Sequence, residues 1–392
     1  MKAFVLVALA IAQLAAAQSS IVTGTAPGFA AGVTGGGSAP TTFISTTAEL
    51  ITALESSGPM NIVIGGTFDF RGTEGTTTLP SCFPYTCVPS AGGQGLLNTL
   101  DGCGSLPLTN VVLDTAGIEG INVQSDKTLV GLGTNTQLIG KGLRFVDVSN
   151  IIIQNIEITN LNPEYVWGGD ALVFSGTSKI WIDHVTTSLL GRQHYSFGES
   201  SDDLITISNS FINGVTTNSA TCDGHTYWGL ELVGSGDRIT FYSPFVLIHP
   251  RIVDHLFTEN YVLNTSGRSP ALSGNTLFHA VNNVWENNSG HLIEGTADGM
   301  GVYEGNAFIN TPTVVVDGFV GQLYDATTAN AAQCVAEFKR DCVANSFSNA
   351  GAFPEDQTGF FADFNGLTIV SAASAASIVS TVPASAGNTL PT

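Results

Sequence analysis

Short apolar segments with polar ends recur along the middle of the chain. Each unit begins with one or two polar residues, continues with three or four mostly β-branched positions, and ends in a polar turn that often holds Asn. Counted from Lys127, Asn150, Lys179 and Asp203, successive units start 23, 29 and 24 residues apart. Such steps are too short for strand-helix-strand units and match one turn of a coil made of short strands. The units occupy residues 126–130, 150–156, 179–185, 203–211 and 237–241.

This repeat predicts an all-β chain that folds as a parallel β-helix. Stacking the coils places each strand in register with its neighbours and lines the interior with Val, Ile and Leu, so the solenoid forms one cooperative body. The alternative is a β-sandwich, whose strands should alternate apolar and polar residues more regularly than Ile151-Ile152-Ile153 does. We therefore expect one β-helix domain over residues 18–392.

One coil contains more residues than the others. Residues 237–241 begin a unit like residues 203–207, but the expected continuation at residues 258–263 comes 16 residues late. Removing an insert, Tyr242–Phe257, restores the register. The insert is too apolar for an ordinary surface loop. Two interpretations stay open: the insert packs over a face of the helix, or it is a translated intron, which we favour.

The N-terminus has the plan of a secretory signal peptide over residues 1–17. Basic Lys2 precedes an apolar run, and small residues end at Ala17, where we expect cleavage. The run is shorter than the ~20 residues needed to span a bilayer. We therefore predict a secreted protein, in which Asn264 and Asn287 begin glycosylation acceptor motifs.

Composition narrows the possible partners. Hydrophobic residues make up 43% of the chain and charged residues 11%, which is typical of a folded protein. The formal net charge of −20 repels phosphate backbones and anionic membrane surfaces. We expect neither a nucleic-acid partner nor a membrane partner.

Six cysteines in an exported chain indicate disulfide bonds. Six cysteines allow 15 pairings, and the sequence favours only the local pair Cys334–Cys342. A metal site is not expected, because no pair of cysteines is two residues apart and no histidines match them.

Six motifs follow one another along the chain, among them Trp167-Gly168-Gly169-Asp170-Ala171, Gly191-Arg192-Gln193-His194-Tyr195 and Ser266-Gly267-Arg268-Ser269-Pro270. In this order they resemble the motifs of a fungal pectin lyase, a member of polysaccharide lyase family 1 in the pectate lyase superfamily. The resemblance implies a single-domain, right-handed parallel β-helix with loops that form a substrate cleft. It also implies internal cleavage of α-1,4-linked, methyl-esterified galacturonan by β-elimination, which leaves 4,5-unsaturated ends. The other motifs are residues 181–185, 220–224 and 279–283.

The resemblance also implies partners and bonds. The expected substrate is methyl-esterified pectin, the expected state is a monomer, and no cofactor is expected. The family's disulfide plan adds Cys82–Cys103 and Cys87–Cys222 to the local pair.

The proposed chemistry places demands on specific residues. Elimination removes the proton on C5 of the uronate and expels the oxygen on C4, so the site needs a base and stabilisation of an enolate. The resemblance makes Arg268 the proton-abstracting residue. Because a free guanidinium is always protonated, either neighbouring cations must favour its neutral form or its charge does most of the work.

Arg192 is the second expected cation. Related pectate lyases place an acidic, calcium-binding segment at this point, so the resemblance implies that a fixed positive side chain replaces the metal. We expect Asp170 to orient Arg192 or to contact substrate. Trp167, Tyr227 and Trp228 are expected to stack on sugar rings or to pack in the core.

Neighbouring polar residues allow other interpretations. Asp183 and His184 look like a catalytic pair, but adjacent strand residues point to opposite faces, which favours a role in coil turns. Trp181 is expected in the interior. A polygalacturonase-type hydrolase would need two carboxylates; Asp202-Asp203 and Gly224-His225 resemble its motifs only in the wrong order.

Two departures leave a non-catalytic wall-binding β-helix as a further alternative. Family members usually carry Lys directly after the Arg-Ser-Pro turn, where this chain has Ala271. The insert also interrupts the coil just before Arg268.

Overall fold

The structure is a computed structural model that describes residues 21–242 and 260–391. The predicted signal peptide lies outside the described residues, as does the whole predicted insert except Tyr242. Among the described residues, no helix is long and apolar enough to cross a membrane.

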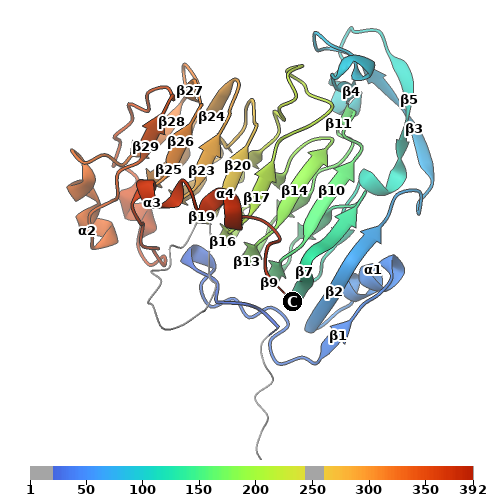
Figure 1. The fold of residues 1–392 in the computed structure, drawn as a ribbon, viewed down its shortest axis with the longest axis horizontal. Helices are drawn as coiled ribbons and strands as arrows, with labels where there is room; N and C mark the ends of the chain where they lie inside the picture. Colours follow the sequence, from blue (N-terminus) through green and yellow to red (C-terminus); the bar gives the residue numbers. More distant parts are fainter. Residues whose placement is uncertain (1–20, 243–259, 392) are drawn as a thin grey trace, which may run out of the picture.

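Three ladders of parallel strands wind into a β-helix whose coils stack along the long axis of the molecule (Figure 1). The first two ladders share one 17-stranded sheet, because the long strands β2 and β7 run along both. The first ladder contains β2 (Met60–Asp69), β7 (Lys127–Ile139), β9 (Ser149–Gln154), β13 (Ser178–Asp183), β16 (Asp203–Ser208), β19 (Arg238–Tyr242), β22 (Leu277–Val281), β25 (Gly299–Glu304) and β28 (Gly321–Asp325), with β1 (Thr41–Phe43) at its edge.

The second ladder completes the large sheet, and the third forms a sheet of its own. The second contains β10 (Glu157–Leu161), β14 (Thr186–Leu190), β17 (Phe211–Asn213), β20 (Tyr261–Leu263), β23 (Val284–Glu286), β26 (Ala307–Ile309) and β29 (Ser346–Ser348). The third contains β6 (Ile121–Asn122), β8 (Leu143–Val146), β12 (Leu172–Ser175), β15 (Tyr195–Phe197), β18 (Leu230–Leu232), β21 (Ala271–Leu272), β24 (His291–Gly295) and β27 (Thr313–Val315).

The remaining elements are short. A small, mostly antiparallel sheet contains β3 (Thr76–Cys82), β4 (Gly95–Leu97), β5 (Thr109–Asp114) and β11 (Tyr165–Val166). The α-helices are α1 (Thr47–Glu55), α2 (Val335–Phe338), α3 (Ala375–Ile378) and α4 (Val382–Ser385). The 3-10 helices are η1 (Gly28–Ala30), η2 (Pro89–Ala91), η3 (Thr99–Asp101), η4 (Thr115–Gly117), η5 (Ala331–Cys334) and η6 (Phe361–Phe364).

The strands that the repeat predicted stack in the expected order. Ile151, Ile180, Ile205 and Ile239 are register partners on β9, β13, β16 and β19. Their side chains are fully buried in the interior of the helix. The right-handed parallel β-helix expected from the sequence is therefore confirmed, and the β-sandwich alternative is wrong.

An extra layer covers part of the first ladder. Ile152 and Trp181 point away from the interior but are only 4% and 3% exposed, because residues 22–33 pack on them. Both faces of these strands are thus apolar, which explains why Ile151-Ile152-Ile153 does not alternate with polar residues. Trp181, expected in the interior of the coil, is instead buried on its outer face.

Helix α1 lies against the first coils. Thr46 and Glu49 form a capping box at its N-terminus, and Leu50, Ala53 and Leu54 are buried in the main core. The helix lies beside β2 at the N-terminal end of the β-helix (Figure 1).

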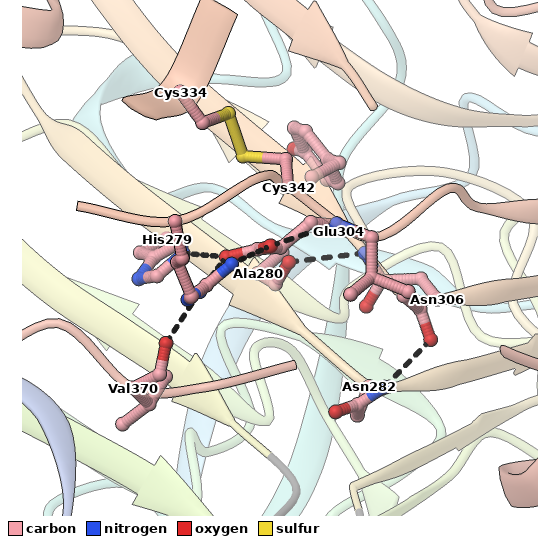
Figure 2. A network of polar contacts seen from close by, with 12 residues as sticks. His279, Ala280, Asn282, Glu304, Asn306, Cys334, Cys342 and Val370 are labelled. Carbon is pink, nitrogen blue, oxygen red and sulfur yellow. Dashed lines mark hydrogen bonds and ion pairs between the residues drawn. A yellow bond between two sulfur atoms is a disulfide. The ribbon is translucent and has the colours of Figure 1, made fainter. Parts of the chain in front are cut away.

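A buried charge cluster fixes the C-terminal segment to the last coils (Figure 2). Glu304 on β25 is fully buried and accepts hydrogen bonds from Arg340 at 2.7 and 2.6 Å. His279 Nε2 lies 2.9 Å from Glu304 Oε1. The disulfide Cys334–Cys342 closes the short loop that carries Arg340, and Arg340 also donates to the carbonyl of Val370.

After this cluster the chain returns toward the first coils along the second ladder (Figure 1). Ile378 and Val382 pack against Tyr261 and Val284. The backbone N–H of Leu390 donates to Asn155 Oδ1, directly after β9, at 3.0 Å. One face of the second ladder is therefore covered.

The corner between β19 and β20 contains the extra residues that the repeat indicated. β19 ends at Tyr242 and β20 begins at Tyr261, 19 positions later. On the preceding coil their register partners Ser208 and Phe211 are only 3 positions apart, which leaves a difference of 16. Tyr242, expected as the first residue of the insert, lies in β19 and packs against Val281.

Candidate active site

The outward side chains of the third ladder form one continuous row. The inward side chains next to them include the stacked rings of Phe145, Phe174 and Phe197, with centroids 4.9 and 4.4 Å apart. Because parallel strands lie ~4.8 Å apart, the row presents one side chain per coil at that spacing. A ligand that contacts the whole row must therefore extend over several coils. In order, the row is Arg144, Val173, Ser196, Glu231, Ala271 and Glu294.

Two hollows open along this row. The large hollow has a volume of about 540 Å³ and lies over its C-terminal half. The small hollow has a volume of about 110 Å³ and lies over its N-terminal half. The large hollow is lined in part by Glu199, Glu231, Arg268, Ala271 and Glu294, and the small one by Glu119, Arg144, Trp167, Asp170 and Val173.

Arg192 is held in one orientation between the two hollows. Its Nε and Nη2 donate to the two carboxylate oxygens of Asp170 at 3.1 and 2.8 Å. The ring centroid of Trp167 lies 3.8 Å from the guanidinium carbon of Arg192. Burial lowers the pKa of Arg192, but the charges of Asp170 and Glu231 outweigh it and leave that pKa raised. Arg192 is therefore a fixed positive charge.

Arg268 projects from the turn between β20 and β21, where its φ of 41° lies in the left-handed region. Its Nη1 donates to Glu231 Oε1, and its Nε donates to Glu294 Oε1 at 3.2 Å. The rings of Trp228 and Tyr227 lie 5.2 and 5.9 Å from its guanidinium carbon. The charged side chains that contact its guanidinium are therefore the carboxylates of Glu231 and Glu294.

Ala271 lies between two carboxylates on the row. It is the register partner of Glu231 on one side and of Glu294 on the other. The methyl side chain offers no charge to either; instead Arg268 contacts both carboxylates, and Arg192 Nη2 also lies 3.6 Å from Glu231 Oε2. The residue that departs from the family pattern therefore lies inside the candidate site.

Aromatic residues complete the wall beside Arg268. Tyr227 and Trp228 meet edge to face, and the hydroxyl of Tyr227 donates to Glu294 Oε2 at 2.6 Å. Burial raises the pKa of Glu294, but hydrogen bonds from His291 and Tyr227 and the charge of Arg268 leave that pKa lowered. Burial and the bond to Glu294 raise the pKa of Tyr227, which keeps its hydroxyl neutral.

The disulfide bonds of the structure join the cysteines that the resemblance pairs. They are Cys82–Cys103, Cys87–Cys222 and Cys334–Cys342. The loop after Cys87 carries buried Gln94, which accepts a hydrogen bond from Trp228 Nε1 at 2.9 Å. Gln94 also donates to the carbonyl of Gly191 at 3.1 Å, so it connects the turns that carry Trp228 and Arg192.

Sequence reasoning did not single out Glu231, Glu294 or Gln94. Each carboxylate stands at an outward position of a strand that otherwise buries apolar residues, as in Leu230-Glu231-Leu232. A carboxylate in such a position close to a motif arginine is a usable signal. Gln94 gave none, because its contacts cross from a loop to distant coils.

Asp183 and His184 belong to a coil corner. Asp183 Oδ2 lies 2.8 Å from His184 Nδ1, although the two were expected to point to opposite faces. The reason is that His184 has a φ of 51°, so the strand geometry ends there. Both are 1% exposed, and Asp183 also bonds to Gln154 and Ser208.

The residues that suggested a hydrolase do not form a pair of catalytic carboxylates. Asp203 is paired with Arg238, whereas Asp202 is buried beside Asp237. His225 contacts its own loop. Over residues 21–242 and 260–391, no group of three or more His, Cys, Asp or Glu side chains is arranged to hold a metal ion.

The fold and the site define a class of protein: a parallel β-helix with a charged groove along one ladder. The chain belongs to the pectate lyase family, whose model matches residues 97–386. A probable pectin lyase E of Aspergillus niger is 65% identical over 375 residues, covering 96% of this chain and 97% of the relative. Pectin lyase B of Emericella nidulans is 44% identical over 383 residues, covering 96% of each chain. The family expected from the motifs is confirmed.

Solved structures agree on the fold. A pectate lyase from Bacillus sp. N165 in complex with trigalacturonate superposes with a TM-score of 0.54 at 18% identity, covering 92% of this chain and 98% of that one. Pectate lyase C from Erwinia chrysanthemi gives a TM-score of 0.52 at 17% identity, covering 92% and 96%.

Proposed function

We propose that the protein is a secreted pectin lyase that cleaves methyl-esterified galacturonan within the chain by β-elimination. The observation that carries the proposal is the pair of arginines, Arg192 and Arg268, beside one groove along the third ladder. The high identity to a relative named pectin lyase supports the same activity. Secretion, the monomeric state and glycosylation at Asn264 and Asn287 belong to this proposal.

The arginines supply the charge that elimination requires. Loss of the C5 proton places negative charge on the C6 carbonyl oxygen, and fixed cations in a partly buried site stabilise such a charge strongly. Asp170 and Trp167 hold Arg192 in position for this role. The aromatic side chains of Tyr227 and Trp228 offer faces for a sugar ring next to Arg268.

We assign the step at C5 to Arg268. A guanidinium has no free lone pair, so Arg268 must release one of its own protons before it takes the proton from C5. Glu231 Oε1, to which Arg268 Nη1 donates, is the acceptor in contact for that proton. The neutral guanidine then takes the C5 proton, while the bond from C4 to its oxygen breaks and the electron pair leaves with that oxygen.

The large hollow suits a neutral ester better than a free acid. Three carboxylates, Glu199, Glu231 and Glu294, line it together with one arginine, Arg268. A galacturonate carboxylate placed there meets like charges, whereas a methyl ester does not. This balance supports an esterified substrate.

Turnover of highly esterified pectin tests the proposal. We expect ultraviolet-absorbing, unsaturated ends, unchanged activity in the presence of a chelator, and much slower turnover of polygalacturonate. New reducing ends without ultraviolet absorbance would instead identify a hydrolase. Binding to pectin without any product would identify the non-catalytic wall-binding alternative.

A further inference from the structure

The small hollow at the other end of the row carries a cation without a charged partner. Arg144 is the outward residue of β8, and its Nη1 donates to Asn122 Oδ1 at 2.9 Å. It forms no ion pair, whereas every other arginine among residues 21–242 and 260–391 is paired with Asp or Glu. The paired arginines are Arg71, Arg192, Arg238, Arg268 and Arg340.

An unpaired arginine is conspicuous in a protein with a net charge of −20. Arg144 is partly buried and lines the small hollow with Trp167 and Asp170. A guanidinium has five N–H donors in a planar fork that matches a carboxylate. The single bond to Asn122 leaves most of these donors for a ligand.

Arg144 belongs to the same row as the proposed reaction centre. Four coil steps, through Val173, Ser196 and Glu231, lead from Arg144 to Ala271. At ~4.8 Å per step this distance is roughly 19 Å along the helix axis. A polysaccharide that lies along the row can therefore contact both hollows at once, with several sugars between them.

The two hollows differ in charge balance. In the small hollow, Asp170 is paired with Arg192, so Arg144 faces only one further carboxylate, that of Glu119. In the large hollow three carboxylates surround one arginine. A free uronate is therefore repelled at the reaction centre but not beside Arg144.

We propose that Arg144 forms a subsite for the free carboxylate of an unesterified galacturonate, several sugars away from the methyl ester that reacts. The proposal rests on the proposed pectin lyase function and deepens it. On this proposal the protein prefers substrate segments that place a neutral methyl ester at the large hollow and a free carboxylate at the small one.

The test compares Arg144→Gln with Arg144→Lys on two substrates, fully esterified pectin and the same pectin after random partial de-esterification. We expect Arg144→Gln to lower the ratio of turnover on the second substrate to that on the first by about three- to tenfold, the scale of one charge-assisted contact at a partly exposed site. Arg144→Lys, which keeps a positive charge, should retain part of the wild-type ratio. Lys179→Gln, which removes an exposed charge from β13 in the other sheet, is the matched control and should leave the ratio unchanged.

Product analysis supplies a second readout. Among products of the partially esterified substrate, free uronates should be enriched at one fixed distance from one of the two new ends, unsaturated or reducing, and Arg144→Gln should abolish the enrichment. An even distribution, or an enrichment that survives the substitution, would overturn the subsite.

Binding of partially esterified oligogalacturonates, measured by calorimetry, separates the two proposals. If the wild-type protein does not cleave fully esterified pectin, the proposed function fails, and a weaker affinity of Arg144→Gln would still support the subsite. If cleavage occurs while the ratio and the affinity are the same in wild type and Arg144→Gln, only the subsite fails.

Discussion

Arg192 and Arg268 lie on either side of a single carboxylate. Arg192 Nη2 is 3.6 Å from Glu231 Oε2, and Arg268 Nη1 donates to Glu231 Oε1. The two arginines come from different coils, and the carboxylate of Glu231 between them offsets the repulsion of their like charges. In the proposed reaction both guanidinium groups stabilise the charge that develops during elimination, so substrate must alter this arrangement.

The first prediction concerns Arg268. Lys at this position keeps the charge but loses the planar fork that contacts Glu231 and Glu294 together. Turnover of esterified pectin by Arg268→Lys should fall by about 10²-fold or more, the scale of a lost acid-base group. Initial rates are measured by ultraviolet absorbance, with circular dichroism to verify the fold. Near-normal rates would assign the step at C5 to another residue.

The second prediction concerns the carboxylates of the large hollow. Glu231→Gln preserves the shape of the side chain but removes a charge that repels a free uronate. We expect turnover of weakly esterified pectin, relative to highly esterified pectin, to rise by about three- to tenfold at low salt and less at high salt. Glu199→Gln is the matched control, because Glu199 lines the same hollow without an ion pair to either arginine. A smaller change is expected for Glu199→Gln, and an equal change in both variants would mean that the summed charge of the hollow, and not the position of Glu231 beside the arginines, sets the preference.

The third prediction concerns pH and stability. Burial raises the pKa of Asp202 to about 7 and that of Asp237 to about 6, and the backbone N–H of Asp202 donates to Asp237. A carboxyl whose pKa is higher in the folded than in the unfolded state stabilises the fold at any pH below its pKa in the unfolded chain. That stabilisation is lost as pH rises through its pKa in the folded state. Thermal unfolding temperatures should therefore fall as pH increases from about 4 to about 7.

Asp202→Asn identifies the group responsible. Asp202 Oδ2 is buried without a hydrogen-bond partner, which suits a neutral side chain, while Oδ1 accepts from Thr177. We expect the fall in unfolding temperature with pH to become shallower in Asp202→Asn. An identical pH profile in the variant would place the titration elsewhere.

The fourth prediction concerns the insert. Two deletions of equal length, residues 242–257 and residues 243–258, both restore the spacing between β19 and β20. The second keeps Tyr242, which packs against Val281 and Val370. We expect the deletion of residues 243–258 to be at least as stable as the full chain, because a shorter loop has a lower closure entropy cost. In the first deletion Thr258 takes the position of Tyr242, and the loss of the buried ring should lower the free energy of unfolding by about 1–3 kcal/mol relative to the second.

Denaturant unfolding and pectin turnover of the deleted chains, with sequencing of the transcript, check this prediction. A mature transcript that retains these codons, together with lower stability and activity in both deletions, would show that the insert is a genuine element of the protein. The intron interpretation would then be wrong.

The fifth prediction concerns the buried cluster at the C-terminal end (Figure 2). Burial raises the pKa of Glu304, but hydrogen bonds from Arg340 and His279 outweigh it and leave that pKa lowered. Arg340→Met removes the cation and leaves a buried carboxylate, which should lower the free energy of unfolding by about 3 kcal/mol. The exposed neighbour Lys339 provides a control, Lys339→Gln, with little expected effect. Equal stability of both variants would mean that the cluster does not hold the C-terminal segment.

The sequence by itself determined the β-helix and the residues that carry the family's motifs. A repeat of short apolar strands can be identified locally, because each coil contributes the same inward positions, as Ile151, Ile180 and Ile205 do. The count of 16 extra residues followed from the same repeat. Arg192, Arg268 and Asp170 were found because their motifs resemble those of a known family.

Only the tertiary structure decided what surrounds these residues. Glu231, Ala271 and Glu294 are 40 and 23 positions apart in the chain, yet the register of β18, β21 and β24 makes them neighbours. The number of residues between two stacked positions depends on how many residues each loop contains. No local pattern specifies which outward positions of successive coils become neighbours. For the same reason the sequence could not show that Arg268 is held by carboxylates of the row. Nor could it show that Arg144, which is itself part of the row, forms no ion pair with a described residue.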